Sequence, residues 1–449
     1  MSSQFQVPTG TRDIGEDTIA LYDRIRRIAD EVYKKYGSKA IDTPVIERTD
    51  IVQSLYGECF DKEVFWVGEE KSYFLRYDLT LPSARYVGNH GLVNFRRHQF
   101  GKVYRNDAPN FEHGRYREFV QCDFDIYGTD GGSQIYDAEM LSAAIEVLDY
   151  IGLPYRFYLN DRRWLYSLVL KSGVSEEMIK PVCSTLDKMD KKTIDEIVSE
   201  LTYERMLPDD VVSSLQEMIK NIQSLKSNEE VLYLMQENGI DTVEMKRLLF
   251  RIGTMRVCLN PLLARGLDYY TGIIYEIVEP STGITFASGG RYDNMVERFS
   301  SHVKIPAIGF SIGVDRVVNL YQKLKPDTRS ELEFEILVGS AGQWKRYDSI
   351  DERFKLMTML RKEGFRVTTM TNQKPKMKGQ LETCFAKNIP VMVLIGENEV
   401  DANTANVKDI RKEIEYVGVP FDDVPSKARE ILVFDDVPSK VREILNLMN

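Results

Sequence analysis

Residues 265–272 combine functional groups that seldom occur side by side. They read Arg-Gly-Leu-Asp-Tyr-Tyr-Thr-Gly and run into an apolar segment at 273–277. Arginine supplies a fixed positive charge, aspartate a carboxylate and the two tyrosines phenol hydroxyls, while glycine lets a ligand or another backbone approach closely. The pattern predicts a loop that enters a strand and presents these groups together. An ordinary strand edge with half-buried tyrosines is the alternative.

Arginines also gather around an expected hairpin. Two strands, at 100–105 and 116–126, enclose a polar loop, and Arg105, Arg115 and Arg117 lie around the turn. This arrangement suits a polyphosphate, because a planar guanidinium binds two oxygens at once and keeps its charge. Composition alone favours a solvated basic hairpin.

Two further stretches carry polar groups on expected strands. A strand over 73–82 would place Asp78 and Thr80 on the same side, where a carboxylate and a hydroxyl can hold an ammonium group. An apolar strand from Ala307 would lead to a helix start that carries Arg316. Taken alone, Asp-Leu-Thr is too common a triplet to indicate function, and most strand–helix junctions serve only packing.

Composition indicates a globular protein of two or three domains. The chain has 449 residues, 43% of them hydrophobic and 29% charged. No apolar run approaches the roughly 20 residues that span a bilayer, and the amino terminus resembles neither a secretory signal nor a transit peptide. We therefore expect a cytoplasmic protein with no membrane contact.

The net charge and the cysteine and histidine content limit which metal sites and binding partners we expect. The five cysteines and four histidines form no paired ligand motif, which argues against a disulfide framework or a metal site. The net charge of −10 weakens the case for a nucleic-acid partner without excluding it, because phosphate contacts require only a local basic surface.

The elements that would position these groups follow from the apolar spacing. We expect amphipathic helices over 16–36 and 138–151, and a strand over 40–47 whose Pro44 belongs at a sheet edge or a bulge. Residues from about 160 to 250 show helical spacing and little strand character.

The last third of the chain has a different pattern. A polar stretch with a proline at 321–330 predicts a linker. Beyond it strands and helices alternate, which indicates a parallel or mixed α/β layer. Strands are expected at 334–338, 365–369 and 391–395, and helices at 347–361 and 378–387. The segment 421–432 recurs almost unchanged at 434–445, and these two copies are too few for a solenoid.

Six motifs, in this order, resemble those of the histidyl-tRNA synthetase family, and the Asp-Leu-Thr triplet resembles its eukaryotic and archaeal branch. They are TGTRD at 9–13, DLT at 78–80, the arginine hairpin, ARGLDYYTG at 264–272, GGRYD at 289–293 and GFSIGVDR at 309–316. The resemblance implies an α+β protein, in which a class II antiparallel-sheet catalytic core carries a helical insertion and a C-terminal α/β anticodon-binding domain. The implied domains are the first part of the core at 1–160, the insertion at 161–252, the second part of the core at 253–325, and the anticodon-binding domain with the duplicated segment at 331–449.

The same resemblance implies a ligase that activates L-histidine with ATP to histidyl-adenylate and transfers it to the 3′ end of tRNA(His). ATP would come with Mg²⁺, and no metal site in the protein itself is expected. The first helix and strand would build a homodimer interface, the alternative being an edge strand in a monomer. The implied catalytic residues are Arg265, Arg105 and Gln121. Those implied for ATP are Arg105, Arg115, Phe119 and Arg316. Those implied for histidine are Asp78, Thr80, Gln121, Asp125, Arg265, Tyr269 and Tyr270.

One departure and one rival interpretation stay open. Asp107 stands two residues after Arg105, where many class II synthetases have glutamate, and this leaves the role of its carboxylate open. The rival is a binding or regulatory protein that kept the fold without the chemistry. Such relatives usually lose part of the arginine set or of the RGLDYYTG loop, and both are complete here.

Overall fold

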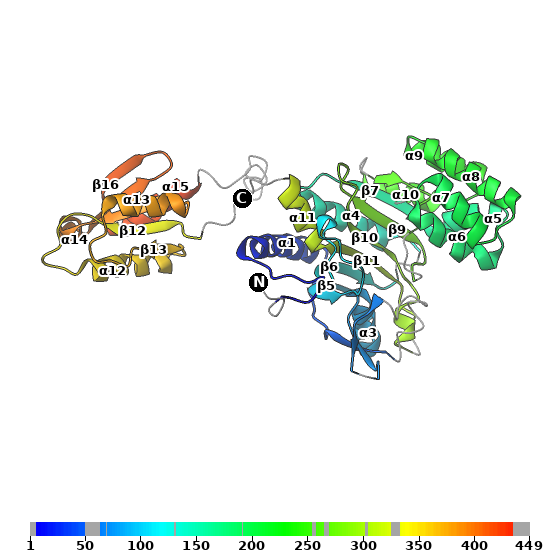
Figure 1. The fold of residues 1–449 in the computed structure, drawn as a ribbon, viewed down its shortest axis with the longest axis horizontal. Coiled ribbons are helices and arrows are strands. Elements are labelled where there is room, and N and C mark those ends of the chain that lie inside the picture. The colour runs from blue at the N-terminus through cyan, green and yellow to red at the C-terminus, as the bar shows by residue number, and fades with distance from the viewer. Residues whose placement is uncertain are drawn as a thin grey trace. The chain divides into compact units, whose positions relative to one another are not determined.

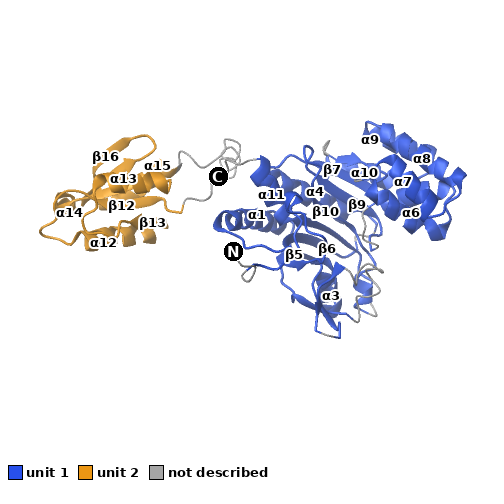
Figure 2. Cartoon of the chain, in the orientation of Figure 1, with its two compact units in different colours: residues 1–328 blue, residues 329–449 orange. Residues whose placement is uncertain are grey.

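The computed structural model describes residues 6–49, 63–68, 70–129, 132–190, 192–253, 257–264, 269–300, 304–324 and 333–433. The chain divides into two compact units, a larger unit of residues 1–328 and a smaller unit of residues 329–449 (Figure 2). Within the described ranges, no helix is both long and apolar enough to cross a membrane.

An eight-stranded mixed sheet forms the centre of the larger unit (Figure 1). Only the pairs at its two edges, β1 with β5 and β7 with β8, are parallel, and the pairs between them are antiparallel. The strands in spatial order are β1 (Lys39–Ala40), β5 (Phe95–Tyr104), β6 (Glu118–Tyr127), β11 (Ala307–Gly313), β10 (Thr285–Arg291), β9 (Ile273–Val278), β7 (Arg156–Asp161) and β8 (Val257–Leu259). This confirms the expected antiparallel core and the arginine hairpin, which is β5 and β6.

The two faces of this sheet have different environments, and β6 shows why. The side chains of Val120, Cys122, Phe124 and Ile126 are buried in the hydrophobic core together with helices α1 (Glu16–Lys35), α4 (Ile135–Ile151) and α11 (Val314–Leu324). Because side chains alternate along a strand, Gln121, Asp123 and Asp125 point to the opposite face. The helices expected over 16–36 and 138–151 are confirmed.

A second, three-stranded sheet corrects two predicted strands. Its order is β2 (Ile46–Arg48), β4 (Tyr73–Leu75) and β3 (Trp66–Val67). The single strand predicted over 40–47 is wrong, because β1 and β2 belong to different sheets and Pro44, which lacks a backbone donor, lies between them. The strand predicted over 73–82 is also wrong, since it ends at Leu75 and helix α3 (Thr80–His90) follows.

Helices fill the segment between β7 and β8, as the sequence predicts. They are α5 (Arg162–Lys171), α6 (Ile179–Leu186), α7 (Ile194–Ser199), α8 (Asp209–Ser224), α9 (Asn228–Glu237) and α10 (Val243–Ile252), with short turns η3 (Glu176–Met178) and η4 (Asp187–Asp190) and the π-helix η5 (Glu200–Glu204). Their buried side chains join the same hydrophobic core as the eight-stranded sheet.

The smaller unit has its own five-stranded sheet. The order is β13 (Val367–Thr369), β12 (Ile336–Ser340), β14 (Val391–Ile395), β15 (Thr404–Asp409) and β16 (Ile414–Pro420). The first three strands are parallel and the last two antiparallel, so the expected α/β layer is confirmed, while the hairpin of β15 and β16 was not predicted. Its helices are α12 (Ser349–Lys362), α13 (Met377–Ala386), α14 (Glu397–Ala402) and α15 (Val424–Val433).

Two sequence features fall at the ends of the described ranges. Residues 321–324 form the last turn of α11 rather than a linker, and 325–332 lie outside the described residues. The first copy of the repeated segment forms the 3-10 turn η7 (Phe421–Asp423) and most of α15, which packs Val424 and Ala428 into the core of the smaller unit. The second copy, at 434–445, lies outside the described residues.

Candidate active site

A cavity of about 290 Å³ opens on the polar face of the eight-stranded sheet. Residues of β6, β10 and β11, of the hairpin loop between β5 and β6, of the loop before α3 and its first residue, of the segment before β9 and of the start of α11 line it. They include ten of the predicted site residues: Asp78, Thr80, Arg105, Arg115, Phe119, Gln121, Asp125, Tyr269, Tyr270 and Arg316. The remaining one, Arg265, lies outside the described residues. The fold thus brings distant motifs to one place.

Arg105, the residue after β5, lies against two aromatic rings. Its guanidinium carbon lies 4.2 Å from the ring centroid of Tyr77 and 5.2 Å from that of Phe119, and Nε donates to the carbonyl oxygen of Tyr77 at 3.2 Å. Burial disfavours its charge, but Tyr77, Asp78 and Asp107 outweigh this effect and raise its pKa. The site therefore contains a guanidinium that stays charged at every physiological pH.

The other two hairpin arginines lie in different places. Arg115 is exposed and lines the cavity. Arg117 is not among the residues that line the cavity. Its Nε donates to the carbonyl oxygen of Asp107 at 3.1 Å, and its backbone N–H donates to the carbonyl oxygen of Gly10 at 2.7 Å. Arg117 therefore braces the hairpin against the amino-terminal segment, a difference that the spacing of the arginines does not reveal.

Asp125 is held by a buried partner that the sequence interpretation missed. Arg97 lies directly opposite it on β5, and Nη2 of Arg97 is 2.5 Å from Oδ2 of Asp125. The hydroxyl of Tyr292 donates to the other carboxylate oxygen. Burial raises the pKa of Asp125, while Arg97 and Tyr292 act to lower it. An arginine at the position opposite Asp125 on an expected hairpin was the signal that could have revealed this pair.

Asp123, on the same face of β6, is the second carboxylate near Arg97. It is 1% exposed, and its Oδ2 is 3.9 Å from Nη2 of Arg97. Burial raises the pKa of Asp123 to about 7, with Arg97 acting in the opposite direction. One guanidinium therefore serves two buried acids, and Asp123 is the less well compensated of them.

Steric crowding explains why position 309, in the GFSIGVDR motif, is a glycine. A Cβ atom added there would lie 2.0 Å from Oδ1 of Asp125, far inside contact distance. The same backbone position offers its carbonyl oxygen to the hydroxyl of Tyr275 at 2.6 Å. Gly309 therefore lets the neighbouring strand approach the carboxylate that faces the cavity.

Asp78 and Thr80 reach the cavity by a route different from the predicted one. Asp78 lies in the loop after β4, and its Oδ1 accepts the backbone N–H of Leu81 at 3.0 Å. Thr80 is the first residue of α3, and Pro82 lies in its first turn. An acceptor before the helix and a proline in its first turn are helix-start signals, which explains why the strand ends early.

The segment that carries Tyr269 and Tyr270 is fastened at its carboxyl end. The centroids of the two rings lie 4.8 Å apart. The backbone N–H of Thr271 donates to the carbonyl oxygen of Arg291 at 2.7 Å, and Nη1 of Arg162 donates to the carbonyl oxygen of Tyr270 at 3.0 Å. These contacts place both phenol rings at the cavity wall.

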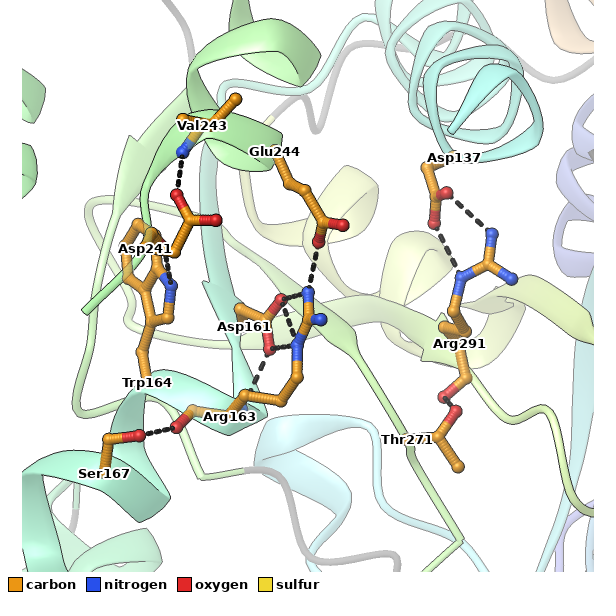
Figure 3. A network of polar contacts seen from close by, with 10 residues as sticks. All are labelled: Asp137, Asp161, Arg163, Trp164, Ser167, Asp241, Val243, Glu244, Thr271 and Arg291. Atoms are coloured by element: carbon orange, nitrogen blue, oxygen red, sulfur yellow. Dashed lines mark hydrogen bonds and ion pairs between the residues drawn. The ribbon is translucent and has the colours of Figure 1, made fainter. Parts of the chain in front are cut away.

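Ion pairs anchor Arg291, which binds this segment, and Arg163 at the nearby start of α5 (Figure 3). Arg291 pairs with Asp137 of α4 at 2.6 Å. Arg163, at the start of α5, pairs with Asp161 at 2.6 Å and with Glu244 of α10 at 2.6 Å. Ion pairs thus link the cavity wall to α4 and link the helices between β7 and β8 to the end of β7.

A partly buried ion pair ties the amino-terminal segment to α11. Oδ1 of Asp315 accepts from Nη2 of Arg12 at 2.7 Å and from the hydroxyl of Tyr22 at 2.6 Å, and Oδ2 accepts the backbone N–H of Val120 at 2.7 Å. Arg12 also lies 3.9 Å over the ring of Tyr116. The network therefore joins the TGTRD motif, the arginine hairpin and the helix start next to Arg316.

Replacing Arg12 by alanine is expected to loosen this junction. The variant should lose about 1–3 kcal/mol of unfolding free energy, because a charge-assisted hydrogen bond and a cation–π contact disappear. For ATP, the nucleotide that the sequence resemblance implies for Arg316, the Michaelis constant should rise several-fold, since α11 carries that residue. Urea unfolding and ATP titrations would measure the two effects, with exposed Asp13→Ala as the control. A normal constant for ATP in a destabilised variant would argue against a positioning role.

Both units of the chain match known protein families. Residues 10–317 match the family model described as histidyl-tRNA synthetase, and residues 336–431 match that of an anticodon binding domain. A histidine–tRNA ligase from Danio rerio is 32% identical over 92% of this chain and 86% of its own length. A cytoplasmic histidine–tRNA ligase from Dictyostelium discoideum is 32% identical over 96% of this chain and 91% of its own.

A solved structure shares the fold. The histidyl-tRNA synthetase from Nostoc sp. PCC 7120 aligns with a TM-score of 0.77 and 24% sequence identity, over 96% of this chain and 100% of that one. The family model covers both halves of the cavity, from the TGTRD motif to the helix start that carries Arg316. The chain therefore belongs to the histidyl-tRNA synthetase family.

Proposed function

We propose that the protein is a histidine–tRNA ligase, which activates L-histidine with ATP to histidyl-adenylate and transfers the histidyl group to the 3′ end of tRNA(His). The observation that carries this proposal is the cavity itself. Fixed guanidinium groups and an aromatic ring lie in the same cavity as a carboxylate held by a buried arginine. The first set suits a nucleotide, and the second suits a ligand with polar N–H groups.

In the first step a carboxylate oxygen of histidine attacks the α-phosphorus of ATP. The new oxygen–phosphorus bond forms as the bond to pyrophosphate breaks, and no side chain needs to act as nucleophile. Negative charge grows on the phosphate oxygens, so positioning and fixed cations supply the catalysis. Arg105 takes this role in our proposal, together with Arg265.

ATP would lie along the arginine side of the cavity. Phe119 and Arg316 would hold the adenine ring from its two faces, and Arg115, exposed where it lines the cavity, would reach the outer phosphates. Mg²⁺ would accompany ATP on its phosphate oxygens, as membership of the family implies.

Histidine would lie against β6. Asp125 and Tyr270 would bond the imidazole nitrogens, and Asp78, Thr80 and Gln121 would surround the α-ammonium group, with Tyr269 completing the wall. All six line the cavity. A site that pairs a polar side chain rejects apolar amino acids by roughly 10⁴ or more, because its buried groups would stay unmatched.

The second step and the partners follow from the family. The terminal adenosine of tRNA(His) would attack the acyl carbon and release AMP, and the smaller unit would bind the anticodon. We further propose a cytoplasmic homodimer, with a core at 1–160 and 253–325, a helical insertion at 161–252 and an anticodon-binding domain at 331–449.

The direct test is the exchange of labelled pyrophosphate into ATP, measured with each of the twenty amino acids. We expect exchange with histidine, and exchange at least about 10³-fold slower with every other amino acid. A binding or regulatory protein with this fold would show no exchange with any of them, and that result would overturn the proposal.

A further inference from the structure

Three polar side chains form a group at the floor of the cavity. Gln121 and Asp123 are alternate residues of β6, and Ser311 lies directly opposite Asp123 on β11. All three line the cavity. Ser311 and Asp123 have no role in the reaction as described above, although both lie beside Gln121.

The amide of Gln121 has one satisfied end and one unsatisfied end. Its Nε2 donates to Oγ of Ser311 at 2.9 Å, whereas Oε1 is buried and accepts no hydrogen bond from the described residues. A buried acceptor without a donor is unfavourable. A cation bound in the cavity would supply the missing donor.

The orientation of this amide depends on a single proton. A serine hydroxyl has one proton to donate and can also accept. Ser311 lies directly opposite Asp123 on the neighbouring strand, so its hydroxyl can donate to that carboxylate, and this interaction acts to lower the pKa of Asp123. Arg97, 3.9 Å from the same carboxylate, also favours its charged form. Once the hydroxyl proton of Ser311 points to Asp123, Ser311 can only accept a hydrogen bond from Nε2 of Gln121. Oε1 of Gln121 is then the atom that can accept a hydrogen bond from the ligand. The reversed amide would instead present its NH₂ group to a cation.

We propose that Ser311 and Asp123 are positioning residues that fix the amide of Gln121 with its oxygen toward the α-ammonium group of histidine. This role rests on the proposed function. It divides the recognition of histidine into two parts. Asp125 with Arg97 and Tyr292 serves the imidazole, whereas Gln121 with Ser311 and Asp123 serves the ammonium.

Two analogues of histidine separate these parts. Histidinol keeps the ammonium and the imidazole, whereas imidazolepropionate keeps the imidazole and lacks the ammonium. Calorimetric titration of the full chain would give both dissociation constants for wild type, Ser311→Ala, Asp123→Asn and Ser311→Thr. Measurement at pH 8 keeps Asp123 charged, since burial raises its pKa only to about 7.

For Ser311→Ala and Asp123→Asn we expect histidinol to bind roughly tenfold more weakly, as for the loss of one oriented hydrogen bond. Imidazolepropionate should change by less than about twofold, because the imidazole side is untouched. Ser311→Thr retains the hydroxyl and should keep the wild-type ratio of the two constants, a ratio in which any crowding by its methyl group cancels.

Equal weakening of both analogues would mean a general distortion of the pocket and would overturn the role. Unchanged binding of histidinol by Ser311→Ala would also overturn it. Histidine-dependent pyrophosphate exchange by the wild-type chain distinguishes these failures from a failure of the proposed function. Absence of that exchange would remove the proposed function and this role together.

Discussion

Replacing Arg105 by alanine is expected to slow the formation of histidyl-adenylate by about 10²–10³-fold, the usual effect of removing one group that stabilises transition-state charge. The guanidinium contacts the rings of Tyr77 and Phe119, so its position is set before substrates bind. Single-turnover kinetics with saturating ATP and histidine would measure the chemical step directly. The dissociation constant for histidine should change little, because our proposal assigns Arg105 to the nucleotide.

Two variants on the same hairpin sharpen this test. Arg105→Lys keeps a positive charge but loses the planar fork, so it should recover only part of the rate. Lys102→Ala removes a half-exposed ammonium that pairs with Glu118 at 2.7 Å, and it should leave the rate within about twofold of wild type. A normal single-turnover rate in Arg105→Ala would exclude this residue from the chemistry.

Replacing Arg97 by methionine should give the largest loss of stability. The side chain of Arg97 is fully buried, and it is the cation nearest to Asp123 and Asp125 among the described residues. Removing one partner of a buried ion pair costs roughly 3–5 kcal/mol, because the other charge stays buried without compensation. We expect a loss of this size near pH 7, measured by urea unfolding of the full chain.

The loss should depend on pH in a defined direction. Without Arg97 the pKa values of Asp123 and Asp125 in the folded state rise further above the unfolded value of about 4. The folded state then binds more protons than the unfolded state, so unfolding free energy falls as pH rises above about 4. The deficit relative to wild type should be smaller at pH 5 than at pH 8.

Arg96→Met is the matched control for this experiment. Arg96 is the preceding residue of β5, and it bonds the carbonyl oxygen of Tyr36 and the carboxylate of Glu139 on the helical side. Its side chain is 25% exposed, so its loss should lower the free energy of unfolding by about 1 kcal/mol. This effect should vary little between pH 5 and pH 8. A deficit in Arg97→Met that is equal at every pH would show that the two acids are not left uncompensated.

Local patterns predicted the secondary elements well wherever their signal is strong. The helical spacing before Gly37 gives α1, and the alternation along residues 116–126 gives β6 with one apolar and one polar face. The local patterns predicted the wrong element where two signals compete. In Asp78-Leu-Thr-Leu-Pro82 the apolar alternation suggested a strand, but an acceptor before the first helical residue and a proline in the first turn start α3.

The sequence by itself determined which kinds of side chain are available and in what order: arginines around a hairpin, carboxylates on one strand face, and two tyrosines before another strand. These follow from residue type and short periodicity, and the family motifs add their expected roles. Only the tertiary structure decided which of them meet. The pairing of β5 with β6 puts Arg97 opposite Asp125, the pairing of β6 with β11 puts Ser311 opposite Asp123, and Arg115 lines the cavity while Arg117 braces a neighbouring segment. The physical reason is that strand register and packing are set by contacts between residues far apart in the chain, such as Val120 and Asp315, which no local pattern encodes.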